Sequence, residues 1–191
     1  MHKRVFLTGL LFLALGVASP ANATPITYTT ILSGANEVPP TGSTATGTAT
    51  FILNLDQLTV NETFTGLIAP ATAAHIHCCT HPGTNAGVAV PFTGFPTATS
   101  GTYSNTFDLT LTSTYNSAFL TAEGGTAASA EAALIAGLNS GDAYANIHDS
   151  TFPGGEIRGL IAVATPEPGG LLLLGTGMIG ILQAVRRRVR A

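Results

Sequence analysis

The chain has 191 residues, enough for one ordinary domain with its terminal segments. Residues 24–164 contain nine acidic residues and one basic residue, Arg158, which gives this region a formal charge of −8. A surface of that sign repels the phosphate backbone, so composition excludes nucleic acid as a partner.

The first 23 residues have the three parts of a secretory signal peptide. Residues 2–4 are basic, residues 5–17 are apolar, and Ala-Asn-Ala at 21–23 fits the small residues before a cleavage site. A membrane anchor is the alternative, but the run is short for a span and is followed by Pro20. We therefore expect cleavage near Thr24 and an exported protein.

Alternating apolar residues predict strands in the first part of the domain, residues 24–164. Residues 26–32 form the first expected strand. Residues 47–55 place Ala49, Phe51, Leu53 and Leu55 on one face. Residues 58–64 continue this pattern after a tight turn at Asp56-Gln57, so the two runs predict a hairpin.

The second part of the domain contains further strands and one helix. Strands are expected at residues 73–77, 88–92, 103–111, 143–148 and 155–163. Residues 129–138 are good helix formers that end before Asn-Ser-Gly, which predicts a short helix. Many short strands with Gly and Pro turns indicate an all-β fold, a Greek-key-like antiparallel β-sandwich with this one short helix.

Three histidines form a candidate metal site. His75 and His77 are two positions apart on an expected strand, so their side chains lie on one face. Two imidazoles in this arrangement can bind one metal ion, copper or zinc, and His148 at a later strand end is the natural third ligand. Shared coordination requires the three ring nitrogens to converge to within about 3–4 Å.

The same histidines have an alternative explanation as members of a buried polar network. Imidazoles can hydrogen-bond to carboxylates and to the backbone without any metal. Glu37, Glu156 and Arg158 are the candidates for such a network, and Arg158 is expected to pair with Glu37 or Glu156. The residues alone leave the two explanations open.

The segment after the histidine pair adds Cys78, Cys79 and His81. Cys79 and His81 keep the strand phase of the histidines, and a thiolate ligand would favour zinc or Cu(I). However, Pro82-Gly83 predicts a turn that breaks this phase, so ligation by Cys79 or His81 is disfavoured. Adjacent cysteines can also bridge each other in an oxidising compartment.

Residues 165–191 form a separate terminal segment. Residues 169–185 are mostly apolar and just long enough to cross a membrane, and Arg186, Arg187 and Arg188 would stay in the cytoplasm. With Pro166, Glu167 and Pro168, the segment resembles the PEP-CTERM sorting signal. This resemblance implies recognition by an exosortase, transient anchoring in the inner membrane and removal of the tail. A plain membrane anchor is the alternative.

The domain resembles the CHRD, or chordin-type, domain through five pieces in order. They are L-S-G-A-N-E-V-P-P at 32–40, A-T-G-T-A-T-F at 45–51, A-A-H-I-H at 73–77, G-D-A-Y-A-N-I-H at 141–148 and P-G-G-E-I-R-G-L-I at 153–161. The resemblance implies an extracellular β-sandwich and no particular activity. The cysteines depart from the family pattern, in which a glycine-containing turn often follows the histidine pair.

The three histidines are also similar to the copper ligands of Cu/Zn superoxide dismutase, another Greek-key sandwich. This similarity covers His75, His77 and His148 alone, and no counterpart of that enzyme's zinc loop or active-site arginine is found. Dismutase activity is therefore disfavoured.

Two functional hypotheses remain. The first is a non-enzymatic binding or structural module of the cell envelope, whose partners would be exopolysaccharide or other envelope proteins. The second is a metal-binding or redox domain that uses the three histidines. The sequence contains neither a nucleophile elbow nor a phosphate-binding glycine loop.

Overall fold

A computed structural model of the chain describes residues 24–164. The expected signal peptide, the sorting motif, the apolar run at 169–185 and the basic tail lie outside the described residues. Within residues 24–164, no helix is long and apolar enough to cross a membrane.

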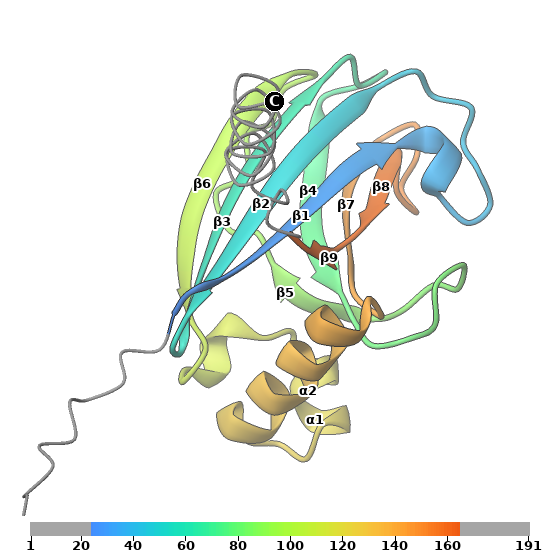
Figure 1. The fold of residues 1–191 in the computed structure, drawn as a ribbon. Helices are drawn as coiled ribbons and strands as arrows, with labels where there is room; N and C mark the ends of the chain where they lie inside the picture. The colour runs from blue at the N-terminus through green and yellow to red at the C-terminus, as the bar shows by residue number, and fades with distance from the viewer. Residues whose placement is uncertain (1–23, 165–191) are drawn as a thin grey trace, which may run out of the picture.

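The described residues form one antiparallel sheet of nine strands that curls into a half-barrel (Figure 1). The strand order is β5-β4-β7-β8-β1-β2-β3-β6, and β9 pairs with β1. The strands are β1 (Ile26–Ser33), β2 (Thr46–Asn54), β3 (Gln57–Thr65), β4 (Ala71–His77), β5 (Val88–Pro91), β6 (Gly101–Asp108), β7 (Tyr144–Asp149), β8 (Ile157–Leu160) and β9 (Ala162–Val163). The prediction of an all-β antiparallel fold is confirmed. The strands form one continuous sheet, whose curvature encloses the core that a sandwich would place between two sheets.

The β2–β3 hairpin follows the expected alternation except at its turn. Phe51, Leu53, Leu58 and Val60 are buried on the concave face. Leu55 is 69% exposed and has a φ of 52°, so it belongs to the turn and not to the apolar face. Gln57 already pairs with Asn54, which places the turn at Leu55-Asp56, one residue earlier than predicted.

Two expected strands differ from the structure, one in where it ends and one in its continuity. β6 stops at Asp108 because the Asp108 carboxylate accepts the backbone N–H of Thr110, and this bond forms a local turn. Leu111, expected on the apolar face, is therefore 51% exposed. The run at 155–163 is divided at Ile161 into β8 and β9.

Helix α2 (Ala127–Ser140) lies below the half-barrel together with the short helix α1 (Ser117–Ala122) (Figure 1). The helix predicted at 129–138 is confirmed as α2, and α1 was not predicted. The Thr126 side chain accepts the N–H of Ser129 at the start of α2, and Gly141 ends the helix with a φ of 77°. Ala130, Leu134 and Leu138 of α2 are buried in the core of the sheet. Two 3₁₀ turns complete the elements, η1 (Gly34–Asn36) and η2 (Thr112–Thr114).

The pairing of β4 with β7 places the two histidine segments side by side. His75 lies opposite Asn146, His77 opposite Tyr144, and Ala73 opposite His148. Ile76 and Ile147, in the other phase of these strands, are buried in the core. The histidines therefore occupy the outer face of the sheet, away from the main core.

Candidate metal centre

His75, His77 and His148 lie together on the outer face of β4 and β7. One ring nitrogen from each residue can be chosen so that all three lie within 4.8 Å of one another. The closest pair is His75 Nδ1 and His148 Nε2, 3.1 Å apart. The three residues predicted as ligands from the sequence are thus brought together by the fold.

Backbone carbonyls orient two of the three rings through hydrogen bonds with the ring nitrogen Nδ1. His77 Nδ1 lies 2.9 Å from the carbonyl oxygen of Ala86, and His148 Nδ1 lies 3.0 Å from that of Pro153. A carbonyl only accepts, so each Nδ1 carries the proton and donates it. In the neutral imidazole the lone pair is then on Nε2, which in His148 points at His75 Nδ1, 3.1 Å away. This arrangement orients metal-binding histidines in many proteins.

The Nε2 atom of His77 is a buried acceptor with no hydrogen-bond partner among residues 24–164. The His77 side chain is only 7% exposed, and His75 and His148 are partly buried. An acceptor removed from water without a partner costs free energy. A metal ion at this position would use the lone pair.

All three rings favour the neutral form. Burial, followed by the charges of His148 and His77, lowers the pKa of His75 to about 4. Burial lowers the pKa of His77, and the hydrogen bond to Ala86 partly opposes this effect. Burial also lowers the pKa of His148, against the effect of the Pro153 carbonyl. Neutral imidazole is the form that coordinates metals, so these shifts keep the site ready for an ion near neutral pH.

The His75–His148 pair meets the expected separation of about 3–4 Å, whereas the set of three nitrogens, within 4.8 Å of one another, is wider than that. Metal–nitrogen bonds of about 2.0–2.1 Å allow two ligands of one ion to be at most about 4.2 Å apart. The nitrogens of His75 and His148, 3.1 Å apart, lie within this distance. The set of three nitrogens spans up to 4.8 Å, which exceeds it. The rings must therefore move closer to one another as an ion binds. The donor set, three imidazoles, suits copper or zinc.

Tyr144 packs directly against the site. Its ring stacks on His77 with centroids 4.7 Å apart and an interplanar angle of 1°, and the guanidinium carbon of Arg158 lies 3.7 Å from its centroid. His77 and Arg158 belong to β4 and β8, the two strands that flank β7. Sequence reasoning missed Tyr144. Pairing the two histidine segments as neighbouring strands would have placed it opposite His77.

Arg158 bonds mainly to the loop that precedes β5. It donates from Nη1 to Asn85 Oδ1 and from Nη2 to the carbonyl oxygen of Thr84, both at 2.7 Å. Its nearest carboxylate oxygen is Glu37 Oε2, 3.9 Å from Nη1. Of the two carboxylates expected to pair with Arg158, Glu37 is therefore the neighbour.

Glu156 has partners of its own. Its carboxylate accepts from the hydroxyl of Ser43 at 2.6 Å and from the backbone N–H of Ile68. It therefore anchors two loops, whereas Arg158 lies over Tyr144, which stacks on His77.

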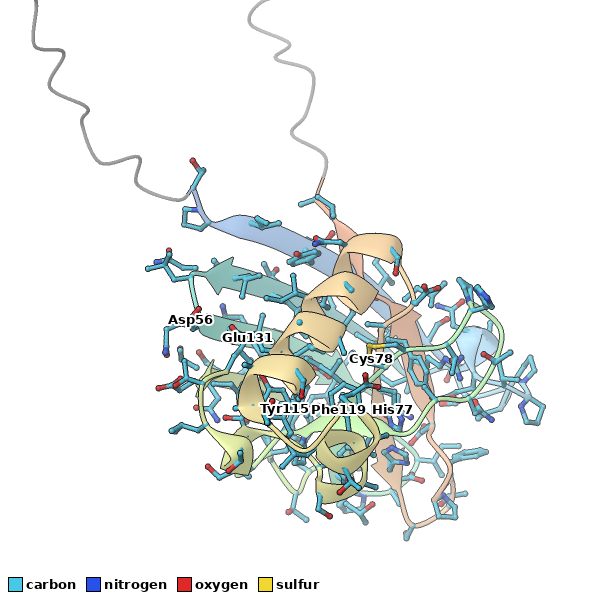
Figure 2. The ribbon with its side chains drawn as sticks, turned by 90° about the horizontal axis from the view of Figure 1, so that it is seen from below. Asp56, His77, Cys78, Tyr115, Phe119 and Glu131 are labelled. Atoms are coloured by element: carbon cyan, nitrogen blue, oxygen red, sulfur yellow. A yellow bond between two sulfur atoms is a disulfide. The ribbon has the colours of Figure 1, made fainter. Side chains whose placement is uncertain are left out.

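The cysteines and His81 are separated from the three histidines. Cys78 and Cys79 form a disulfide with each other, which lies beside α2 (Figure 2). A Cβ on Gly137 of α2 would collide with both sulfur atoms, so glycine lets the helix approach the disulfide. His81 is 95% exposed and lies 3.8 Å from Asp142. The structure places neither Cys79 nor His81 in the histidine cluster.

Comparisons with known proteins give two family matches. The family model described as the CHRD domain matches residues 28–161, and the model described as the PEP-CTERM protein-sorting motif matches residues 164–188. Searches of the curated proteins and of the solved structures found no match.

Proposed function

The chain belongs to the CHRD domain family, and from this premise we propose that its domain binds one copper or zinc ion through His75, His77 and His148. The PEP-CTERM motif marks the protein as exported, envelope-associated and sorted by an exosortase. The ion would therefore be acquired outside the cytoplasm.

The observation that carries this proposal is how the two ring nitrogens of His77 and of His148 are hydrogen-bonded. His77 and His148 donate from Nδ1 to backbone carbonyls, so each has its lone pair on Nε2, and that of His148 points at His75 Nδ1, 3.1 Å away. A purely structural network would be expected to satisfy a buried Nε2, but that of His77 has no partner in the described part of the chain. A metal ion would give this atom a partner, and in the network alternative the side chain of Asn146 is the neighbour that would have to supply one.

Three imidazoles also define the kind of ion. Copper and zinc both accept imidazole nitrogen, and divalent copper binds a given site more tightly than zinc. Three protein ligands leave at least one coordination position for water or another small ligand. We therefore expect copper to displace zinc from the site.

The experiment is a calorimetric titration of the full chain, purified without a histidine tag in mild detergent, with Cu²⁺ or Zn²⁺. Wild type should bind one ion per chain. His75→Ala and His148→Ala should lose this binding at unchanged circular dichroism. His81→Ala, which alters an exposed histidine outside the cluster, should bind as wild type does. Absence of a stoichiometric site in wild type, or retention of it in both cluster variants, would refute the proposal.

We further propose that residues 169–185 hold the precursor in the inner membrane until the exosortase acts. Arg186, Arg187 and Arg188 follow this apolar run and would remain on the cytoplasmic side. In membrane fractions, a Glu167→Ala variant should accumulate as uncleaved precursor. Normal processing of that variant would contradict the role of the Pro-Glu-Pro motif.

A further inference from the structure

A surface pocket of about 380 Å³ lies beside the three histidines and is separate from them. Three segments form its walls: residues 37–41, Asn85, and residues 151–155. Its volume is at the small end of the range for small-molecule sites. The metal proposal does not use this pocket.

The pocket combines apolar walls with one poorly satisfied carboxylate. Val38, Pro39, Pro40, Phe152 and Pro153 give it flat apolar surfaces. Glu37 lines it with a side chain that is 5% exposed; Asn146 lies close to its carboxylate, but within residues 24–164 no donor meets hydrogen-bond geometry at its Oε1. A buried acceptor of this kind is stabilised by a ligand that donates a hydrogen bond.

The charge around Glu37 favours a neutral donor over a cation. Arg158 lies 3.9 Å from the other oxygen of the Glu37 carboxylate and already supplies a positive charge. A cationic ligand at Oε1 would be repelled by Arg158, whereas a hydroxyl group would not. The apolar face of a sugar ring fits against Phe152 and the prolines, and its hydroxyl groups supply donors.

The walls are fixed before any ligand binds. Asn85 donates from Nδ2 to the carbonyl of Val38 at 2.9 Å, and its Oδ1 accepts from Arg158. His148 Nδ1 donates to the carbonyl of Pro153, and a Cβ on Gly155 would collide with Glu37. Such preorganisation lowers the entropic cost of binding.

We propose that this pocket is a subsite for one neutral sugar unit, with Glu37 as hydrogen-bond acceptor and Phe152 as stacking surface. The subsite would be the place where the domain binds exopolysaccharide, one of the partners expected from the sequence. It does not require the metal.

The test is saturation-transfer NMR and calorimetry on the full chain with glucose, galactose, mannose and N-acetylglucosamine, and with choline as a cationic comparison. At least one sugar should bind with a millimolar Kd. Phe152→Ala and Glu37→Gln should each weaken this binding at least tenfold. Leu111→Ala, at an exposed apolar residue outside the pocket, should leave it unchanged.

Thermal unfolding identifies any variant that does not fold, and Phe152→Ala tests the pocket without removing a buried charge. The proposal is overturned if no neutral sugar binds, if choline alone binds, or if folded Phe152→Ala binds the sugar as wild type does. A failure here leaves the titration with Cu²⁺ or Zn²⁺ unaffected, so the two proposals are tested separately.

Discussion

His75 Nδ1 lies 3.1 Å from His148 Nε2, although 73 residues separate the two positions. The pairing of β4 with β7 produces this proximity, and it exists only in the folded domain. The unfolded chain keeps only the local His75–His77 pair. A ligand that binds the folded state more tightly stabilises it.

Metal ions should therefore raise the thermal stability of the domain. An ion present at 100 times its Kd stabilises the folded state by about 2.7 kcal/mol. Wild type with excess Zn²⁺ should unfold at a temperature several degrees higher than the chelator-treated protein. His148→Ala should show no such increase, and an equal increase in that variant would argue against the shared site.

Tyr144→Phe should weaken metal binding without unfolding the domain. The Tyr144 hydroxyl accepts the backbone N–H of Ala86 at 3.1 Å, and the carbonyl of Ala86 orients His77. Loss of such a supporting contact typically lowers metal affinity about 10–100-fold.

Calorimetric Kd values for Cu²⁺ would measure this effect. Tyr103→Phe is the matched control, because the hydroxyl of Tyr103 donates to Thr93, away from the histidines. Equal affinities for the two variants would show that Tyr144 does not support the site.

Glu62→Gln should remove a pH dependence of stability. Glu62 lies on β3 and is 1% exposed, and its carboxylate has no hydrogen-bond partner among the described residues. Burial raises the pKa of this carboxyl from 4.5 to about 8. The folded state therefore retains the proton, and this contribution to stability is full below pH 4.5 and is lost as the pH rises to 8.

Urea unfolding at pH 4.5 and pH 8.5 measures the difference. Each pKa unit corresponds to about 1.4 kcal/mol, so the free energy of unfolding of Glu62→Gln should increase relative to wild type by several kcal/mol between these pH values. A constant difference between Glu62→Gln and wild type would contradict the raised pKa.

Gly137→Ala should destabilise the protein. The new Cβ would collide with the sulfur atoms of Cys78 and Cys79. Overpacking of this kind costs about 1–3 kcal/mol, more than the gain of up to about 1 kcal/mol in helix propensity. Gly87→Ala, where no atom lies within 4 Å of the added Cβ, is the control. Chemical denaturation should show a lower midpoint for Gly137→Ala alone.

The strands and α2 were predictable because their signals are local. The alternation of Phe51 and Leu53 and the helix formers around Leu134 determine strand and helix in short windows. The end of β6 was missed because Asp108 competes for the N–H of Thr110. The curling of one sheet depends on which strands pair, and alternation does not specify this.

For the site, the sequence predicted the three histidines but not what supports them. His75 and His77 share a face by strand periodicity, and His148 was the remaining histidine in a second strand segment. The carbonyls of Ala86 and Pro153 belong to loops whose path depends on the tertiary structure. The exclusion of His81 follows from the turn at Pro82-Gly83, which was visible in the sequence.

The most direct test of the proposed metal site is elemental analysis of the protein purified, without added metal or a histidine tag, from its native envelope. We predict close to one copper or zinc ion per chain in wild type and His81→Ala, and less than about one tenth of this in His148→Ala. A wild-type protein without stoichiometric metal that also takes up none on titration, or a folded His148→Ala that retains the full amount, would contradict the account.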